Sequence, residues 1–98
     1  MELQVNLAMF DNTARVYGNW RPGVLRIDAD GLAFLERGSE TAEALATNEI
    51  ASVSITTHLL GADDVVVGLH RGGSWSLKVD GGGRIVEALR ERGVAVQP

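Results

Sequence analysis

Apolar and polar residues alternate along most of this chain with a period of two, which is typical of half-buried β-strands. The first such run places four apolar side chains on one side of an extended segment, namely Leu3, Val5, Leu7 and Met9. Turn-forming Asp and Asn residues follow, and a second extended run is expected over residues 13–17. Gly18 and the Pro22-Gly23 pair are expected to interrupt that run.

Two hairpins follow from the same pattern. The first joins residues 24–28 to residues 32–36 across Asp30-Gly31, one of the strongest short-range hairpin signals. The second joins residues 65–70 to residues 74–79, and residues 50–57 form a further strand with many β-branched side chains. Residues 41–47 fit a strand by their neighbours, but their Ala, Glu and Leu content favours a helix, so both remain open.

The period changes to 3.6 after the glycine run at residues 81–83. Ile85, Val86 and Leu89 then share one side, which predicts an amphipathic helix at about residues 82–92 with Gly93 as its C-terminal cap. Its apolar side is expected to cover the open end of the sheet. The predicted fold is mainly β: one domain over residues 1–98, with about seven strands in a strongly bent antiparallel sheet or partly open barrel, capped by the C-terminal helix.

The composition and net charge of the chain indicate its cellular location and the classes of partner it is expected to bind. The chain has no cysteine and no basic, apolar leader pattern at its start, so we expect a cytoplasmic protein. Its net charge of −4 disfavours nucleic acid and limits membrane contact to peripheral binding. Eight of the nine basic residues are arginine and only Lys78 is lysine, a bias typical of GC-rich bacterial genomes.

Three stretches resemble the bacterial pleckstrin-homology-like (PH-like) and GRAM-like domains. They are the strand, acidic turn and strand of residues 23–34, the Glu-Ile-x-x-Val step of residues 49–53, and the Trp-containing hairpin and helix of residues 69–89. The resemblance implies the PH-like fold over about residues 13–93. Some PH domains bind phosphoinositides through a basic-x-Arg cluster in the first hairpin; here Arg15, Arg21 and Arg26 are scattered instead.

The residues predict no catalytic site, no metal site and no cofactor. His58 and His70 are 12 positions apart and have no cysteine to complete a ligand set, and the Asp63-Asp64 pair is interpreted as turn chemistry. No Gly-x-Ser-x-Gly elbow occurs, so an enzyme is not expected. Residues 81–83 lack the phosphate-loop pattern and are expected to form a plain turn before the helix.

The candidate binding residues are Tyr17, Trp20, Arg21 and Arg26. Trp20 is expected in a loop as an interface anchor, whereas Trp75 alternates with core positions and is expected to be buried. We therefore expect a non-enzymatic interaction module that binds a protein partner or itself, through Trp20 or the edge of the 41–47 strand. The alternative is a peripheral lipid or small-ligand module that uses the open end of the sheet near these arginines.

Overall fold

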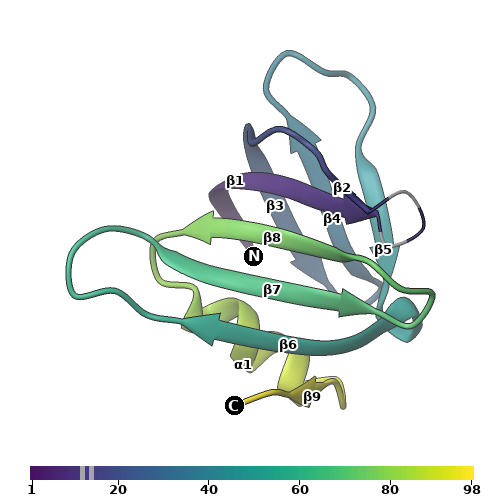
Figure 1. Cartoon of the computed structure of the whole chain (residues 1–98), viewed down its shortest axis with the longest axis vertical. Coiled ribbons are helices and arrows are strands. Elements are labelled where there is room, and N and C mark those ends of the chain that lie inside the picture. Colours follow the sequence, from purple (N-terminus) through teal and green to yellow (C-terminus); the bar gives the residue numbers. More distant parts are fainter. Residues whose placement is uncertain (12, 14) are drawn as a thin grey trace.

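The computed structural model describes residues 1–11, 13 and 15–98, except for the side chain of Tyr17. The described chain contains nine strands, one α-helix (α1) and a short 3-10 helix, Thr47–Glu49 (Figure 1). The strands are β1 (Glu2–Asp11), β2 (Val16–Tyr17), β3 (Arg21–Asp28), β4 (Gly31–Glu36), β5 (Glu43–Ala46), β6 (Ile50–Thr56), β7 (Asp63–Leu69), β8 (Ser74–Val79) and β9 (Ala95–Val96); α1 spans Gly83–Glu91.

The strands form one strongly curled, open half-barrel in the order β5-β4-β3-β1-β8-β7-β6-β9, with β2 paired to the end of β1. All neighbours are antiparallel except β6 and β9. β1 pairs with β3 along its first half and with β8 along its second half, so it joins the β6–β8 side to the β3–β5 side (Figure 1). This arrangement confirms the predicted fold class.

The core fills the concave side of the half-barrel. Buried side chains come from β1 and from each of the strands β3 to β8, and Trp75 is buried as predicted. The helix adds Ile85, Val86 and Leu89, the apolar side expected from the sequence, and α1 packs against β6 (Figure 1). At its C-terminal end Gly93 has a φ of +86° and the Val94 amide donates to the Leu89 carbonyl, as a glycine cap requires.

The 24–36 hairpin forms as predicted. Asp28 Oδ1 accepts a hydrogen bond from the Asp30 amide, and Gly31 has a φ of +145°. A Cβ atom on Gly31 would overlap the carbonyl oxygen of Leu45 on β5, so only glycine lets β5 approach this closely. Residues 43–46 are a strand rather than a helix, because β5 lies on the sheet edge with Leu45 buried and the residues on either side more exposed.

Two sequence expectations in the first third were wrong. Among the described residues of the expected 13–17 strand, Val16–Tyr17 is extended, whereas Thr13 and Arg15 lie in a turn. Pro22 and Gly23 do not interrupt a strand but belong to β3, where Pro22 pairs with Asn6. Gly23 is needed because a Cβ there would overlap the Leu35 carbonyl and touch the Phe34 ring.

Two further differences from the sequence expectations concern β7 and β9, in the second half of the chain. β7 begins at Asp63, so the acidic pair expected in the preceding loop starts a strand instead. β9 was not expected; it adds in parallel to β6, and the Gln97 amide donates to the Val53 carbonyl at 2.8 Å. A two-residue strand with both side chains exposed has no alternating pattern from which it could be predicted.

Candidate interaction surfaces

Trp20 lies in the connection between β2 and β3, as expected, with 48% of its surface exposed. Its ring stacks on the Lys78 ammonium, whose nitrogen is 5.1 Å from the ring centre. Lys78 lies on the outer side of the sheet, between buried Leu77 and Val79. Trp20 therefore packs on the convex surface, where it stays accessible to a partner.

From Lys78, a polar chain leads along the convex surface to the β6–β7 loop. Lys78 Nζ donates to Asp64 Oδ1 at 3.0 Å, and His58 Nε2 lies 2.8 Å from Asp64 Oδ2. The hydrogen bonds from His58 and Lys78 lower the pKa of the Asp64 carboxyl. Asp64 thus holds the base of the β6–β7 loop to β8 as a carboxylate.

The β6–β7 loop carries two adjacent leucines, Leu59 and Leu60, which we call the leucine tip. Leu59 is 100% exposed and Leu60 is 89% exposed, the highest values among the large apolar residues described. Gly61 follows with a φ of +100°, and Figure 1 shows the loop projecting beyond the ends of β6 and β7. Sequence reasoning missed this feature, although two consecutive leucines between His58 and Gly61 were a visible signal.

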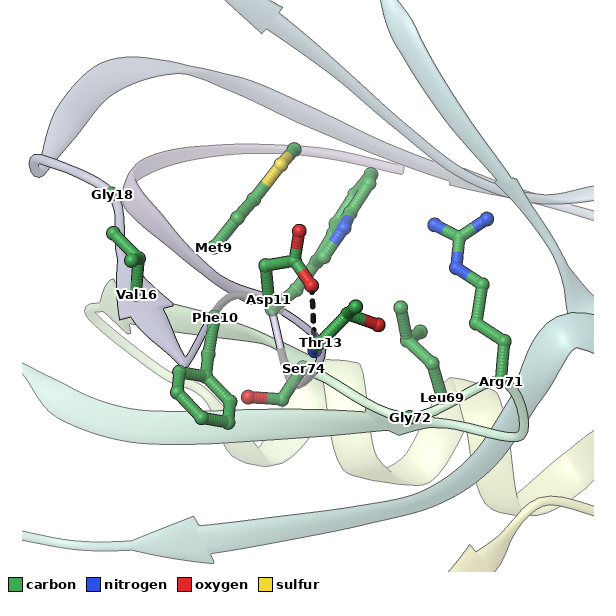
Figure 2. A pocket seen from close by; sticks show the side chains of 11 residues that line it. Met9, Phe10, Asp11, Thr13, Val16, Gly18, Leu69, Arg71, Gly72 and Ser74 are labelled. Carbon is green, nitrogen blue, oxygen red and sulfur yellow. Dashed lines mark hydrogen bonds between the residues drawn. The ribbon is translucent and has the colours of Figure 1, made fainter.

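A hollow of about 660 Å³ opens at the other end of the half-barrel; we call it the end pocket (Figure 2). The β1–β2 region and the β7–β8 turn form its walls. Its lining is mostly apolar and includes the side chains of Met9, Phe10, Val16, Leu69 and Trp75. Figure 2 shows Arg71 beside Leu69 at this hollow; its side chain is 68% exposed and lies 3.5 Å from a Glu49 carboxylate oxygen.

The leucine tip and the end pocket lie at opposite ends of β7. The strand starts at Asp63, just after the tip, and ends at Leu69, which lines the pocket. Seven residues of extended chain span about 20 Å. The same strand therefore separates an apolar projection from an apolar hollow.

Arg21, a predicted binding residue, is committed to contacts inside the chain. Its guanidinium donates to Glu36 at 3.0 Å and to both carboxylate oxygens of Glu43 at 2.8 and 3.1 Å. It also lies over the Phe34 ring, 5.5 Å from the ring centre. The hydrogen bond with Glu43 raises the pKa of Arg21 and lowers that of Glu43, while partial burial opposes both shifts.

The other predicted residues do not join Arg21 in one site. Arg26 lies five residues further along β3 and binds Glu2 Oε2 through Nε and Nη2 at 3.1 and 2.9 Å. The side chain of Tyr17 lies outside the described part of the structure. Among the three candidates with described side chains, Arg21 and Arg26 are in ion pairs within the chain, whereas Trp20 is in none and is about half exposed.

The glycine turn at residues 81–83, where α1 begins, binds a carboxylate of the chain itself. The Gly82 amide donates to Asp63 Oδ2 at 2.9 Å, so a carboxylate of the chain itself occupies the helix N-terminus. Over residues 1–11, 13 and 15–98, no group of three or more potential metal ligands comes together. No helix in the described ranges is long and apolar enough to span a bilayer.

Comparison of the chain with the models of known protein families, and with curated proteins, finds no match.

Proposed function

We propose that this chain is a bacterial, cytoplasmic, PH-like module without enzymatic activity, which binds a protein partner through the leucine tip. The single observation that carries the proposal is the exposure of two adjacent leucines, at 100% and 89%. Isolated apolar residues are common on protein surfaces, but a projecting pair contributes nothing to its own core. The curled half-barrel with a C-terminal helix supports the PH-like assignment.

The energetics favour a partner with a pocket. Burying a leucine side chain fully gives about 1.5 to 3 kcal/mol, so the tip offers about 3 to 6 kcal/mol when both leucines are enclosed. Trp20 lies on the convex surface, and Lys78, Asp64 and His58 connect it to the base of the tip. A central apolar anchor with polar groups beside it is the usual composition of a protein-binding surface.

A membrane is a poorer partner for the same residues. Even a single myristoyl chain gives only marginal, reversible membrane binding, and two leucines bury fewer methylene groups than that chain. The chain's charge of −4 adds repulsion from anionic lipid. Arg21 and Arg26, which the lipid alternative requires, are paired with carboxylates of the chain itself. These observations support protein binding over headgroup binding.

Photo-cross-linking tests the proposal directly. A benzophenone side chain is introduced at Leu60 in cells that express the chain, with a matched label at Glu40, an exposed residue between β4 and β5. We expect a defined protein adduct from position 60 and none of that size from position 40. Adducts with lipid alone, or the same adducts from both positions, would contradict protein binding through the leucine tip.

A further inference from the structure

We propose that protonation of His58 fixes the leucine tip, so that the tip binds its partner more tightly at about pH 6 than at about pH 8. This inference rests on the proposed function and names the regulation of that same surface. It follows from one contact at the base of the β6–β7 loop, between the imidazole of His58 and the carboxylate of Asp64.

The β6–β7 loop, residues 57–62, is held by a single contact beyond its two strands. The last pair of the β6–β7 ladder joins Thr56 to Asp64. Within the described chain, the one hydrogen bond formed by residues 57–62 joins His58 Nε2 to Asp64 Oδ2 at 2.8 Å. We call this contact the neck. It closes the segment from which the two leucines project, and they follow His58 directly (Figure 1).

Asp64 is a fixed acceptor for the neck. Its backbone belongs to β7, and its other carboxylate oxygen accepts a hydrogen bond from Lys78 Nζ on β8 at 3.0 Å. The hydrogen bonds from His58 and Lys78 lower the pKa of Asp64, so this group is a carboxylate throughout the range from about pH 5 to 8. Opening of the neck is therefore a movement of the loop and not of the sheet.

The charge at the neck depends on His58, because histidine is the side chain that changes charge between about pH 5 and 8. The charged groups that the described chain brings to it are Asp64 on β7 and, bonded to Asp64, Lys78 on β8. Residues 57–62 contain no other ionisable side chain. Asp63, the other carboxylate beside the loop, is bonded to the Gly82 amide. The protonation of His58 thus sets the strength of the neck.

Both protonation states of the imidazole bond to the carboxylate, but with different strengths. A neutral imidazole with its proton on Nε2 donates a hydrogen bond without a charge of its own. Protonation adds the attraction between opposite charges. The side chains of His58 and Asp64 are 44% and 36% exposed, and at such exposure an ion pair changes an equilibrium by up to about fivefold. The neck is therefore closed in more molecules at low pH.

A closed neck improves binding because the tip is already ordered. When a partner encloses Leu59 and Leu60, an open loop loses conformational freedom, and this loss lowers the affinity. The affinity falls in proportion to the fraction of molecules whose loop is ready to bind. A change of up to about fivefold in closure is thus the largest change in affinity that the neck produces.

The variant H58Q separates the charge of His58 from its hydrogen bond. The glutamine amide nitrogen donates to Asp64 as Nε2 does, but it never becomes charged. The matched control is H70Q, which makes the same replacement at an exposed histidine just beyond the opposite end of β7. Both positions are substantially exposed, so both variants should give the circular dichroism spectrum of the wild type.

Native-state proteolysis measures how often the neck opens. A protease that cleaves before leucine is added at about pH 6 and about pH 8, and variants are compared at the same pH, which cancels the pH dependence of the protease. We expect H58Q to be cleaved at Leu59 or Leu60 about two- to fivefold faster than the wild type at the lower pH. At the higher pH the two rates should be equal, and H70Q should match the wild type at both.

Nuclear magnetic resonance shows whether the tip follows His58. In the wild type, the His58 ring and the amides of Leu59 and Leu60 should titrate with one shared midpoint. In H58Q, these two amide signals should be independent of pH between about pH 5 and 8.

The benzophenone label at position 60 reports binding. In lysates adjusted to about pH 6 and about pH 8, the yield of the protein adduct should be up to about fivefold higher at the lower pH. With H58Q in the same labelled chain, the two yields should be equal. This comparison cancels any pH dependence of the partner itself.

Three results would overturn the proposal. They are equal cleavage of H58Q and the wild type at the lower pH, leucine amides that do not follow the His58 ring, and an adduct yield that H58Q does not change. Any of these, together with a defined protein adduct from position 60, would leave the proposed function standing and remove the regulation alone. The absence of a protein adduct at both pH values would remove the proposed function, and the pH-dependent affinity with it.

Discussion

Replacing Arg21 with methionine is expected to lower the free energy of unfolding by about 2 kcal/mol. The change removes three charge-assisted hydrogen bonds, to Glu36 and Glu43, and keeps an apolar stem over the Phe34 ring. Hydrogen bonds to charged groups contribute about 1.5 to 3 kcal/mol each when enclosed. Here the two carboxylate side chains are 39% and 43% exposed, so solvent screening reduces the total to roughly one such bond.

Urea unfolding at pH 7, followed by tryptophan fluorescence, measures this difference. The matched control is R26M, because Arg26 and Glu2 are both more than half exposed and their pair should contribute less than about 0.5 kcal/mol. For a domain of this size, the R21M change corresponds to a fall in Tm of about 8 to 16 °C. If R21M and R26M unfold at the same urea concentration, Arg21 is not a structural residue and our reasoning is refuted.

The pH dependence supplies an independent check. Arg21 lowers the pKa of Glu43 in the folded state, so this pair stabilises the fold above the unfolded pKa of about 4.3. Its contribution is lost as the pH falls through the lower, folded pKa. The stability difference between the wild type and R21M should be constant from pH 7 to about pH 5 and shrink toward pH 3. A difference that grows on acidification would contradict this assignment.

Three further changes test single contacts. G31A should cost about 3 kcal/mol in urea unfolding, since a Cβ there overlaps the Leu45 carbonyl at a φ of +145°; an unchanged midpoint would contradict the close approach of β5. D63A should cost about 1 kcal/mol by removing the acceptor for the Gly82 amide, and hydrogen exchange should then accelerate in the first turn of α1. W20A should cost no more than about 1 kcal/mol, the value of an exposed cation–π contact, whereas W75A should cost about 3 to 5 kcal/mol; equal losses would contradict the exposed position of Trp20.

Alternation along the chain predicted most of the longer strands of the half-barrel, because the residues on one side of each strand must be apolar to face the core. The 24–36 hairpin, buried Trp75 and the apolar side of α1 all follow from local patterns of this kind. The position of Pro22-Gly23 inside β3 did not follow, because it depends on how the Phe34 ring packs across the strand pair. Local turn statistics contain no information about that contact.

The candidate surfaces were predicted less well than the fold. Trp20 was identified, and its exposure agrees with the expectation. Arg21 was chosen for its charge, but its carboxylate partners lie on β4 and after the following turn on β5, positions that only the folded sheet brings together. The end pocket likewise combines residues from β1, β2 and β8, and no spacing along the sequence predicts its walls.

The central position of β1 also sets the order in which this chain acquires its structure. Leu7 pairs with Arg21 on one side and with Leu77 on the other. The β3–β4 and β7–β8 hairpins close across short turns, but β1 stays half-paired until β8 has been synthesised. Closing such a long loop makes folding slow, in the range of milliseconds to seconds, and leaves the earliest strand with an open edge during translation.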